Sequence, residues 1–321
     1  MNPIAQAPIY VLSTRGKHQV CGEVWDWIQA HPGIRREVLE DEESLLGRAV
    51  APELSGARVV IDANLRRMHR RVLKLTASRD LVIFDHDVCQ NHIRHSEWYR
   101  RYETVLLTLQ PKLVIVSSLF LQRRLRERGL NAIYIAKGYS PAVISDIGSP
   151  RTIARAFVGR TDHKVYRDRK RMLRVLLRDE GVRILRAPYG PRYNELLNRI
   201  EIFVSVDAGF REYMIKNFEA MAAGCVVLAA RQGEGEEEAL GLVDGENVVL
   251  YGSLEEARSR LAWLDSHPDE KRAIAEAGQR LARERHTWHH RADRLEAAVV
   301  APGHAPRRGP RWSERRRLWC L

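Results

Sequence analysis

The side chain in this sequence best suited to hold a ligand rich in hydroxyl groups is Glu219. It lies in a stretch with helical spacing, residues 213–223, and Gly224 follows as a helix stop before a buried apolar run. Phe218 and Met221 share the packing face of that helix, so the Glu219 carboxylate lies directly beside apolar side chains. Such a carboxylate must reach solvent or find hydroxyl donors, and the vicinal diol of a ribose is one suitable partner.

Three cations in the second half of the chain suit a phosphorylated ligand. Arg160 and Lys164 follow Gly159, which ends an apolar run and allows a tight backbone turn. Two cations there could stabilise a leaving diphosphate, whose charge grows as the bond to it breaks. Lys216 lies three residues before Glu219, and a Lys in the first turn of a helix opposes the macrodipole unless an anion is nearby. A solvated surface cation is the alternative for each.

The segment 85–95 (DHDVCQNHIRH) supports three interpretations. Its His and Cys residues recur at every third position and could form a mixed zinc set, although the paired spacing of established zinc motifs is missing. Asp85 and Asp87 form an Asp-x-Asp pair that could hold manganese. We favour the third interpretation, in which His86 follows the apolar run 81–84 and hydrogen-bonds a ligand hydroxyl or shares charge with a reacting centre. A structural histidine is the alternative, and we predict no bound metal.

Two glycines and one tyrosine are weaker candidates for the same site. Gly16 lies in the loop 13–19 after the first apolar run, which lacks the G-x-x-x-x-G-K-[ST] pattern of an NTPase phosphate loop. Gly138 follows the last apolar run of the first half, where backbone turning is a sufficient reason for a glycine. Tyr193 could stack near a base, although core packing is its more common use.

The elements that position these residues are short β-branched runs, each followed by a longer helical stretch. This alternation predicts parallel βαβ units, and the unbroken runs are typical of strands covered on both faces. The expected strands are 9–13, 59–62, 81–84, 113–117 and 133–136 in a first set, and 156–159, 182–185, 202–206, 226–229 and 248–251 in a second. The sequence therefore predicts an α/β protein of two Rossmann-like, doubly wound domains facing each other across a cleft. Its ligands should bind at the carboxyl ends of the strands.

The length of 321 residues also favours two domains over a single core. We expect a first domain at 1–140, a linker rich in Gly, Pro and Ser at 141–151, a second domain at 152–286, a helix at 287–299 that could cross back to the first domain, and a disordered basic tail at 300–321.

The net charge of +12 comes from two blocks. Residues 151–186 hold twelve Lys or Arg against four Asp or Glu, and residues 307–317 hold six Arg against one Glu. Such blocks predict local anionic partners, with solvated faces as the alternative. In the tail, Trp312 and Trp319 among arginines suit an anionic membrane surface or nucleic acid.

The remaining composition indicates a cytoplasmic protein, which could be peripheral at the membrane. No basic residue precedes the first apolar run, as a secretory signal would require, and no apolar stretch reaches the roughly 18–20 residues of a membrane span. The four cysteines form no CxxC pair, and a chain of this length needs no disulfide framework.

Three segments carry a resemblance to a known family. FEAMAAGCVVLAA (218–230), VDGENVVLY (243–251) and AIAEAGQRLARERHTWHHRADRL (273–295) resemble the C-terminal domain of GT-B glycosyltransferases of the group 1 type. Within that group the spore-maturation (CgeB-like) branch ends in a similar His-Thr followed by Arg. The resemblance is specific from about residue 157 to 295. Before that it is weaker, although LVIFDHD, VIVSS and YIAKGYSP occur in the order of the family's N-domain strands.

The resemblance implies transfer of a sugar from a nucleotide-diphosphate sugar to an acceptor, with retention favoured and neither metal nor cofactor required. It places Glu219 on the ribose and His86 near the donor sugar. It also assigns a group of residues to the donor site or its backbone loops: Arg160, Lys164, Tyr193, Lys216, Asn217, Gly16, Gly138 and Gly159. The acceptor could be a saccharide, a lipid-linked glycan, a protein or a nucleic acid.

One position departs from the family pattern. Many group 1 members carry a second Glu eight residues before the ribose Glu, where this chain has Arg211 and places Glu212 one step away. On a helix that step rotates the side chain by about 100°, so Glu212 is a weaker catalytic candidate than His86. Two rival functions remain at this point, a nucleotide-sugar epimerase of the same fold and a nucleic-acid-binding protein.

Overall fold

The computed structural model describes residues 7–28, 31–78, 80–207 and 209–301. These residues form two compact units. Unit 1 holds the described residues up to His92, together with Trp98–Ala136 and those from Arg291 onward, and unit 2 holds Ile93–Glu97 and Lys137–His290. The basic tail with its two tryptophans lies outside the described residues.

Unit 1 is built on a six-stranded parallel sheet with the strand order β2-β1-β3-β4-β5-β6. Its strands are β1 (Ile9–Thr14), β2 (Ile34–Leu39), β3 (Arg58–Asp62), β4 (Asp80–Phe84), β5 (Leu113–Val116) and β6 (Ala132–Tyr134). Strands β3 and β5 are buried along their whole length, as the unbroken apolar runs predicted. The chain leaves β1 towards β2 on one side and returns to β3 on the other, so the carboxyl ends of β1 and β3 form a topological switch point.

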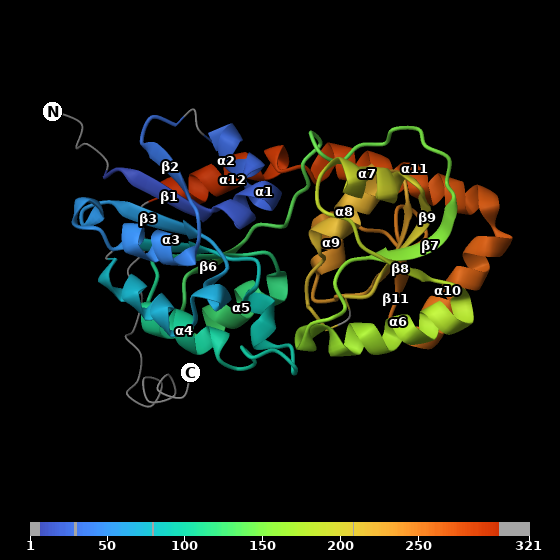
Figure 1. Cartoon of the computed structure of the whole chain (residues 1–321), viewed down its shortest axis with the longest axis horizontal. Helices are drawn as coiled ribbons and strands as arrows, with labels where there is room; N and C mark the ends of the chain where they lie inside the picture. Colours follow the sequence, from blue (N-terminus) through green and yellow to red (C-terminus); the bar gives the residue numbers. More distant parts are fainter. Residues whose placement is uncertain (1–6, 29–30, 79, 208, 302–321) are drawn as a thin grey trace. The chain divides into compact units, whose positions relative to one another are not determined.

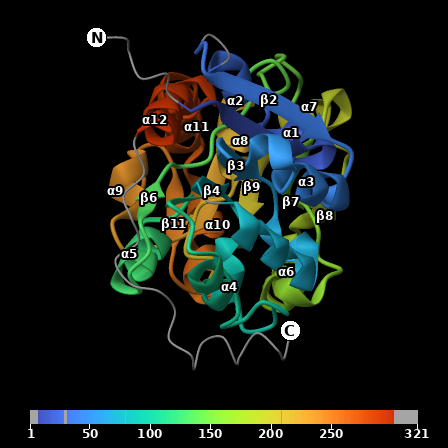
Figure 2. The same cartoon turned by 90° about the vertical axis from the view of Figure 1, so that its left-hand side faces the viewer.

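Helices cover both faces of this sheet. They are α1 (Arg15–Cys21), α2 (Glu23–Ile28), α3 (Glu42–Ala49), α4 (Tyr102–Leu109), α5 (Leu119–Glu127) and α12 (His289–Val300), with 3-10 segments at Pro52–Leu54, Leu65–Ala77 and Val88–Asn91. Helices α4 and α5 lie on one side of the sheet and α12 on the other (Figures 1 and 2). The end of α12 is held by Arg58, whose guanidinium donates to the Val299 carbonyl oxygen at 2.7 Å.

Unit 2 contains a five-stranded parallel sheet with the order β11-β10-β9-β7-β8. Its strands are β7 (Ile153–Val158), β8 (Arg183–Leu185), β9 (Ile200–Ser205), β10 (Val226–Ala230) and β11 (Val249–Tyr251). Strand β7 has β8 on one side and β9 on the other, which makes the carboxyl ends of β7 and β9 the switch point of this unit. Both units therefore have the predicted doubly wound α/β architecture.

The helices of unit 2 are α6 (Arg167–Glu180), α7 (Pro191–Asn198), α8 (Ile215–Ala222), α9 (Glu236–Leu240), α10 (Leu254–Ser266) and α11 (Pro268–Arg285), and a 3-10 turn spans Lys164–Tyr166. Helices α6 and α10 run along one side of the sheet, and α7, α8 and α11 along the other (Figure 1). The apolar core between α6, α10 and the sheet includes Phe157, Leu173, Leu176, Leu261 and Leu264.

Close packing of α11 depends on Gly278. A Cβ added there would lie 2.6 Å from the backbone oxygen of Asn247, in the turn before β11. We expect Gly278→Ala to lower the free energy of unfolding by about 1–3 kcal/mol, because this overlap outweighs the roughly 1 kcal/mol gained when Ala replaces Gly in a helix. Gly47→Ala in α3 is the matched control, since an added Cβ there meets nothing within 4 Å and should stabilise the protein. Urea denaturation checks both, and equal signs for the two substitutions would contradict this interpretation.

Candidate active site

Glu219 is buried on α8 with one carboxylate oxygen unsatisfied. Its exposed fraction is 2%. The Tyr193 hydroxyl donates to Oε2 at 2.8 Å, whereas Oε1 has no hydrogen-bond partner in the described part of the chain. Burial raises the pKa of Glu219 to about 7, although Tyr193 and the charge of Lys216 act in the opposite direction. The site thus holds a carboxylate that lacks the donors its charged form needs.

Lys216 occupies the first turn of α8 and turns towards the end of β7. Its Nζ donates to the Val158 carbonyl oxygen at 3.2 Å and lies 4.8 Å from the centre of the Phe157 ring. Burial lowers its pKa to about 8, and the charge of Asp207 opposes this shift. Gly159 allows the approach, because its φ is +153° and a Cβ there would lie 2.5 Å from Lys216 Nζ.

A buried ion pair joins Asp207 and Arg169, and both charges act on the pKa of Lys216. Asp207 follows β9, accepts from Arg169 and also accepts from the Ser205 hydroxyl at 2.9 Å. Arg169 donates in addition to the carbonyl oxygens of Val206 at 3.1 Å and Arg160 at 3.3 Å. The ion pair thereby ties the loop after β7 to the end of β9, the two strands of the switch point.

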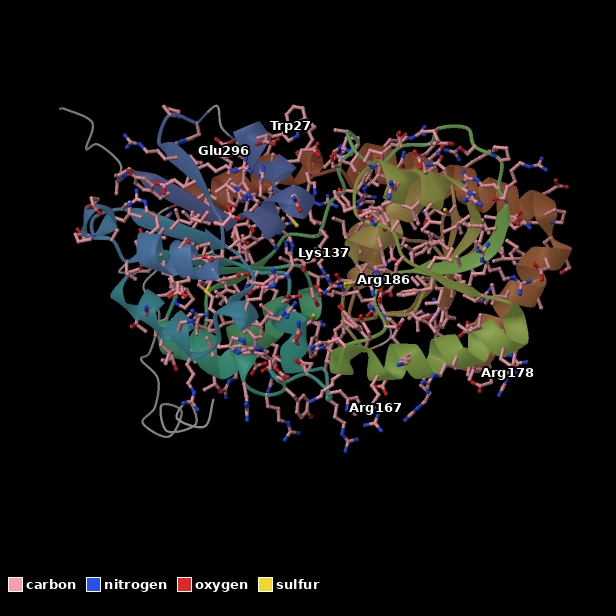
Figure 3. All side chains as sticks on the ribbon, in the orientation of Figure 1. Trp27, Lys137, Arg167, Arg178, Arg186 and Glu296 are labelled. Carbon is pink, nitrogen blue, oxygen red and sulfur yellow. The ribbon has the colours of Figure 1, made fainter. Side chains whose placement is uncertain are left out.

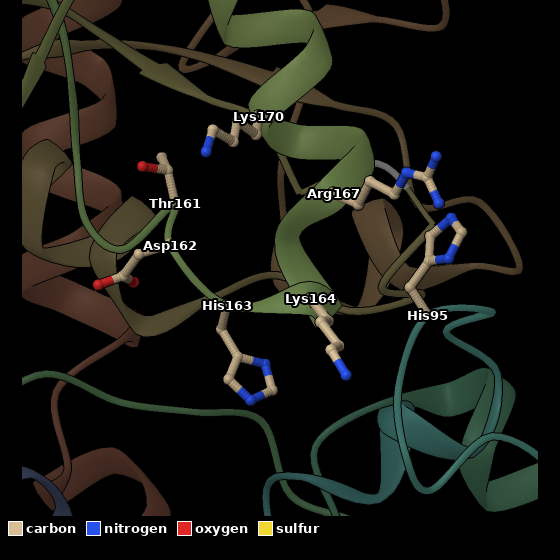
Figure 4. A pocket seen from close by; sticks show the side chains of 7 residues that line it. All are labelled: His95, Thr161, Asp162, His163, Lys164, Arg167 and Lys170. Carbon is tan, nitrogen blue, oxygen red and sulfur yellow. The ribbon is translucent and has the colours of Figure 1, made fainter.

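Arg160 and Lys164 lie on the loop after β7 but differ in surroundings. Arg160 is exposed. Lys164 lines a pocket of about 410 Å³ (Figure 4), together with His95, Thr161, Asp162, His163, Arg167 and Lys170. Glu219 is not among the residues that line this pocket. The structure therefore groups Gly159, Lys216, Tyr193 and Glu219, and it places Lys164 in a neighbouring basic pocket.

Three further predicted residues of unit 2 have well-defined environments. Glu212 is fully buried and lies before α8, with its Oε1 at 2.9 Å from the Lys137 ammonium. Asn217 is 2% exposed, and neither of its amide atoms has a hydrogen-bond partner among the described residues. Gly138 packs against the backbone, since an added Cβ would lie 2.8 Å from Thr287 C and from Trp288 N. Close chain packing is therefore a sufficient reason for that glycine.

His86 and Gly16 belong to unit 1. His86 follows β4 and is 9% exposed. The distance between its Nδ1 and the Nζ of Lys17 is 2.9 Å. Gly16 lies in the first turn of α1, so the loop expected at 13–19 is a helix from Arg15 onward. Among the residues that the structure describes, no group of three or more His, Cys, Asp or Glu is arranged to hold a metal ion.

Three residues of these arrangements were not predicted from the sequence: Lys17, Asp207 and Arg169. Arg169 belongs to the basic block 151–186, for which solvated faces were the alternative, yet this side chain is 4% exposed. Its spacing of four and seven residues from the buried Leu173 and Leu176 is the signal that could have identified it.

The rest of the first basic block does face solvent. Arg167, Arg171, Arg174 and Arg178 recur on α6 at helical spacing and are all exposed. Figure 3 shows Arg167 and Arg178 projecting from that helix. No helix within the described ranges is both long and apolar enough to span a bilayer.

Comparisons with known proteins agree with this architecture. Residues 156–297 match the family model described as glycosyl transferase-like. The structure of HepE from Anabaena, solved with UDP and glucose, is similar with a TM-score of 0.66 and 14% identity, over 92% of this chain and 100% of that one. Sucrose-phosphate synthase from Thermosynechococcus elongatus is similar with a TM-score of 0.63 and 12% identity, over 91% and 98%. A search of curated protein sequences finds no match.

These findings confirm the predicted fold class. The chain has the GT-B fold of these structures, and residues 156–297 match a glycosyl transferase-like domain. Membership of the spore-maturation branch stays a prediction.

Proposed function

We propose that the protein transfers a sugar from a nucleotide-diphosphate sugar to an acceptor, and that the donor binds in unit 2 at the carboxyl ends of β7 and β9. The observation that carries this proposal is the unsatisfied Oε1 of the buried Glu219. It lies on the helix that also brings Lys216 to Gly159 at the switch point, where open α/β sheets bind their ligands.

Glu219 holds the ribose in this proposal. A vicinal diol offers two hydroxyl donors, and the Glu219 carboxylate has an acceptor atom without a protein partner. Hydrogen bonds from the diol favour the charged carboxylate and so offset the burial that raises its pKa to about 7. Tyr193 fixes the orientation of the carboxylate through the other oxygen, a different task from the base stacking suggested for it above.

Lys216 and the loop after β7 hold the diphosphate. The Lys216 ammonium lies 2.5 Å from where a Cβ of residue 159 would be, so a phosphate that it binds would also lie close to the Gly159 backbone. Arg160 and Lys164 follow on the same loop and add positive charge as the nucleotide diphosphate departs. His86 is the proposed contact to the donor sugar. Retention and independence of metal are proposed from the family resemblance.

The solved complexes suggest UDP as the first nucleotide to try, because HepE was crystallised with UDP and with UDP-glucose. A thermal-shift panel of nucleoside diphosphates and their sugars would select the base and the sugar, since a ligand bound only by the folded state raises the melting temperature. The acceptor, whether saccharide, lipid-linked glycan, protein or nucleic acid, is then sought with the selected donor.

Calorimetry with the selected nucleotide tests the site. We expect Glu219→Gln to weaken binding at least tenfold, because a charge-assisted hydrogen bond to the diol contributes about 1.5–3 kcal/mol. Glu195→Gln is the matched control, since Glu195 is an exposed carboxylate on α7 and its replacement should leave the affinity unchanged. Equal affinities of the wild type and Glu219→Gln would contradict the proposal.

The same nucleotide sugars and variants distinguish the proposed function from its two rivals. An epimerase would convert the free nucleotide sugar with no acceptor added. A nucleic-acid-binding protein using the α6 arginines would bind oligonucleotides with an affinity that falls steeply with salt and survives Glu219→Gln.

A further inference from the structure

A chain of buried polar groups lies at the switch point of unit 1. It starts at Asp62, the last residue of β3, which accepts hydrogen bonds from the Ser13 hydroxyl at 3.0 Å and from the Trp25 indole nitrogen at 2.7 Å. These two donors hold Oδ2 of Asp62, and its Oδ1 lies 3.9 Å from the Lys17 ammonium. Lys17 in turn reaches His86. Asp62 is thereby connected to His86 through Lys17, which contacts both residues.

The contact between Lys17 and His86 determines where the imidazole carries its proton. Lys17 Nζ lies 2.9 Å from Nδ1 of His86. An ammonium has three donors and no acceptor, so Nδ1 must be the acceptor and carry no proton. In a neutral imidazole the proton is then on Nε2. An imidazolium would instead direct an N–H from Nδ1 at the ammonium.

Lys17 is charged in this environment. Burial lowers its pKa, but Cys21 and the carboxylates of Asp62, Asp85 and Asp87 raise it, and the net result lies above the usual value of 10.5. The ring of Phe84 adds a further contact, with its centre 5.7 Å from the ammonium. Lys17 is therefore a donor over the whole physiological pH range.

The His86 ring is also fixed in orientation. It meets the Phe84 ring edge to face, with the centres 4.6 Å apart and the planes at 88°. The Cys21 sulfur lies 3.7 Å from the same Nδ1 that Lys17 approaches. Nδ1 thus faces the interior of unit 1, and rotation of the ring would break the contact with Lys17.

We propose that Lys17 is a positioning residue that fixes His86 in the neutral form with its proton on Nε2, so that His86 meets a ligand as a hydrogen-bond donor and not as a base. The matching ligand atom is an oxygen acceptor, such as a sugar hydroxyl or a phosphate oxygen. The contact of His86 with the donor sugar rests on the proposed function, whereas the position of its proton does not.

Nitrogen NMR of the full chain with ¹⁵N-labelled histidine tests this inference, because protonated and unprotonated ring nitrogens have well-separated chemical shifts. The chain has 12 histidines, and the signals lost in His86→Asn identify the ring of interest. We expect a single tautomer with Nδ1 unprotonated and Nε2 protonated. A protonated Nδ1, or averaged signals from two tautomers, would overturn the inference.

Substitutions on α1 show whether Lys17 is the cause. Lys17→Met removes the donor at similar volume, so the two His86 signals should move towards averaged positions, and Lys17→Arg should restore the separation. Arg15→Met is the matched control, because Arg15 is an exposed residue of the same helix and pairs with Glu40. Unchanged His86 signals in Lys17→Met would overturn the role of Lys17. Should His86→Asn not fold, the signals that move in Lys17→Met but not in Arg15→Met identify His86.

These spectra are recorded without nucleotide. A failure of the proposed donor site would leave them unchanged, and it would be seen instead in the calorimetry with Glu219→Gln. A wrong tautomer would overturn the inference while leaving the donor site of unit 2 unaffected.

Discussion

Replacing Asp207 by Ala is expected to lower the free energy of unfolding of unit 2 by about 3–5 kcal/mol, the largest effect that we predict for any single substitution. The Asp207 and Arg169 side chains are 2% and 4% exposed. Without Asp207 the guanidinium is a buried charge with no carboxylate partner, surrounded by the rings of Phe157, Tyr166 and Phe210. Denaturation by urea, followed by circular dichroism, measures the loss.

Two further variants separate charge from hydrogen bonding. Ser205→Ala removes only the hydroxyl that donates to Asp207 and should cost about 1 kcal/mol. Replacing Asp207 and Arg169 together by Leu removes both charges, so the double variant should be more stable than Asp207→Ala. If Asp207→Ala and Ser205→Ala destabilised the protein equally, the ion pair would not have the importance assigned to it.

The pH dependence of stability follows from the same pair. Burial alone would raise the pKa of Asp207, but Arg169 and Lys216 outweigh it and hold the pKa below its usual value of 3.8. The contribution of the pair to stability is therefore present above about pH 4 and is lost as the pH falls below it. Asp207→Ala should consequently show a smaller loss of stability on acidification than the wild type.

The strands could be predicted well from the sequence because the sheets are parallel and covered on both faces. Each buried strand is then an unbroken apolar run between turn residues, and the expected run at 226–229 matches β10 (Val226–Ala230) within one residue. Strand β2 (Ile34–Leu39) was not predicted. It is an edge strand whose residues are partly or fully exposed, so its polar sequence carries no such run.

Candidate site residues could be proposed from the sequence only where local spacing carries the information. Glu219 became a candidate because a single helical turn places it beside apolar residues. Asp207 and Arg169 are 38 positions apart in the sequence, and Lys17 and His86 are 69 apart, so only the tertiary fold brings each pair together. Gly16 illustrates the opposite error, since a glycine suggested a loop where the chain forms the first turn of α1.

The affinity for the nucleotide sugar is expected to have a bell-shaped pH dependence, with its maximum between about pH 7 and pH 8. On the acid side, the diol of the ribose favours the ionised form of Glu219, whose pKa of about 7 in the unliganded protein means that protonation competes with binding. The affinity should therefore fall as the pH decreases below about 7, by up to tenfold per pH unit. Uptake of ligand is accompanied by proton release in this range.

On the alkaline side of the maximum, the affinity changes with pH in the opposite direction. Lys216 has a pKa of about 8, and a diphosphate favours its charged form. The affinity should decrease as the pH rises above about 8, and ligand binding should be accompanied by proton uptake. A nucleotide sugar is the suitable ligand, because its diphosphate is esterified at both ends and lacks the terminal group that titrates near pH 6 in free nucleotides.

The two arms of the bell can be assigned to residues. Glu219→Gln should remove the acid arm and keep the alkaline one, whereas Lys216→Met should do the opposite. Both variants should bind more weakly than the wild type between about pH 7 and about pH 8, and the difference should shrink as the wild type loses the same charge. Calorimetry in two buffers of different ionisation enthalpy measures affinity and proton exchange together. The acid arm requires that the Glu219 carboxylate binds the ribose, and the alkaline arm requires that the Lys216 ammonium binds the diphosphate. An affinity that stays constant from about pH 6 to about pH 9 would therefore show that the ligand contacts neither group.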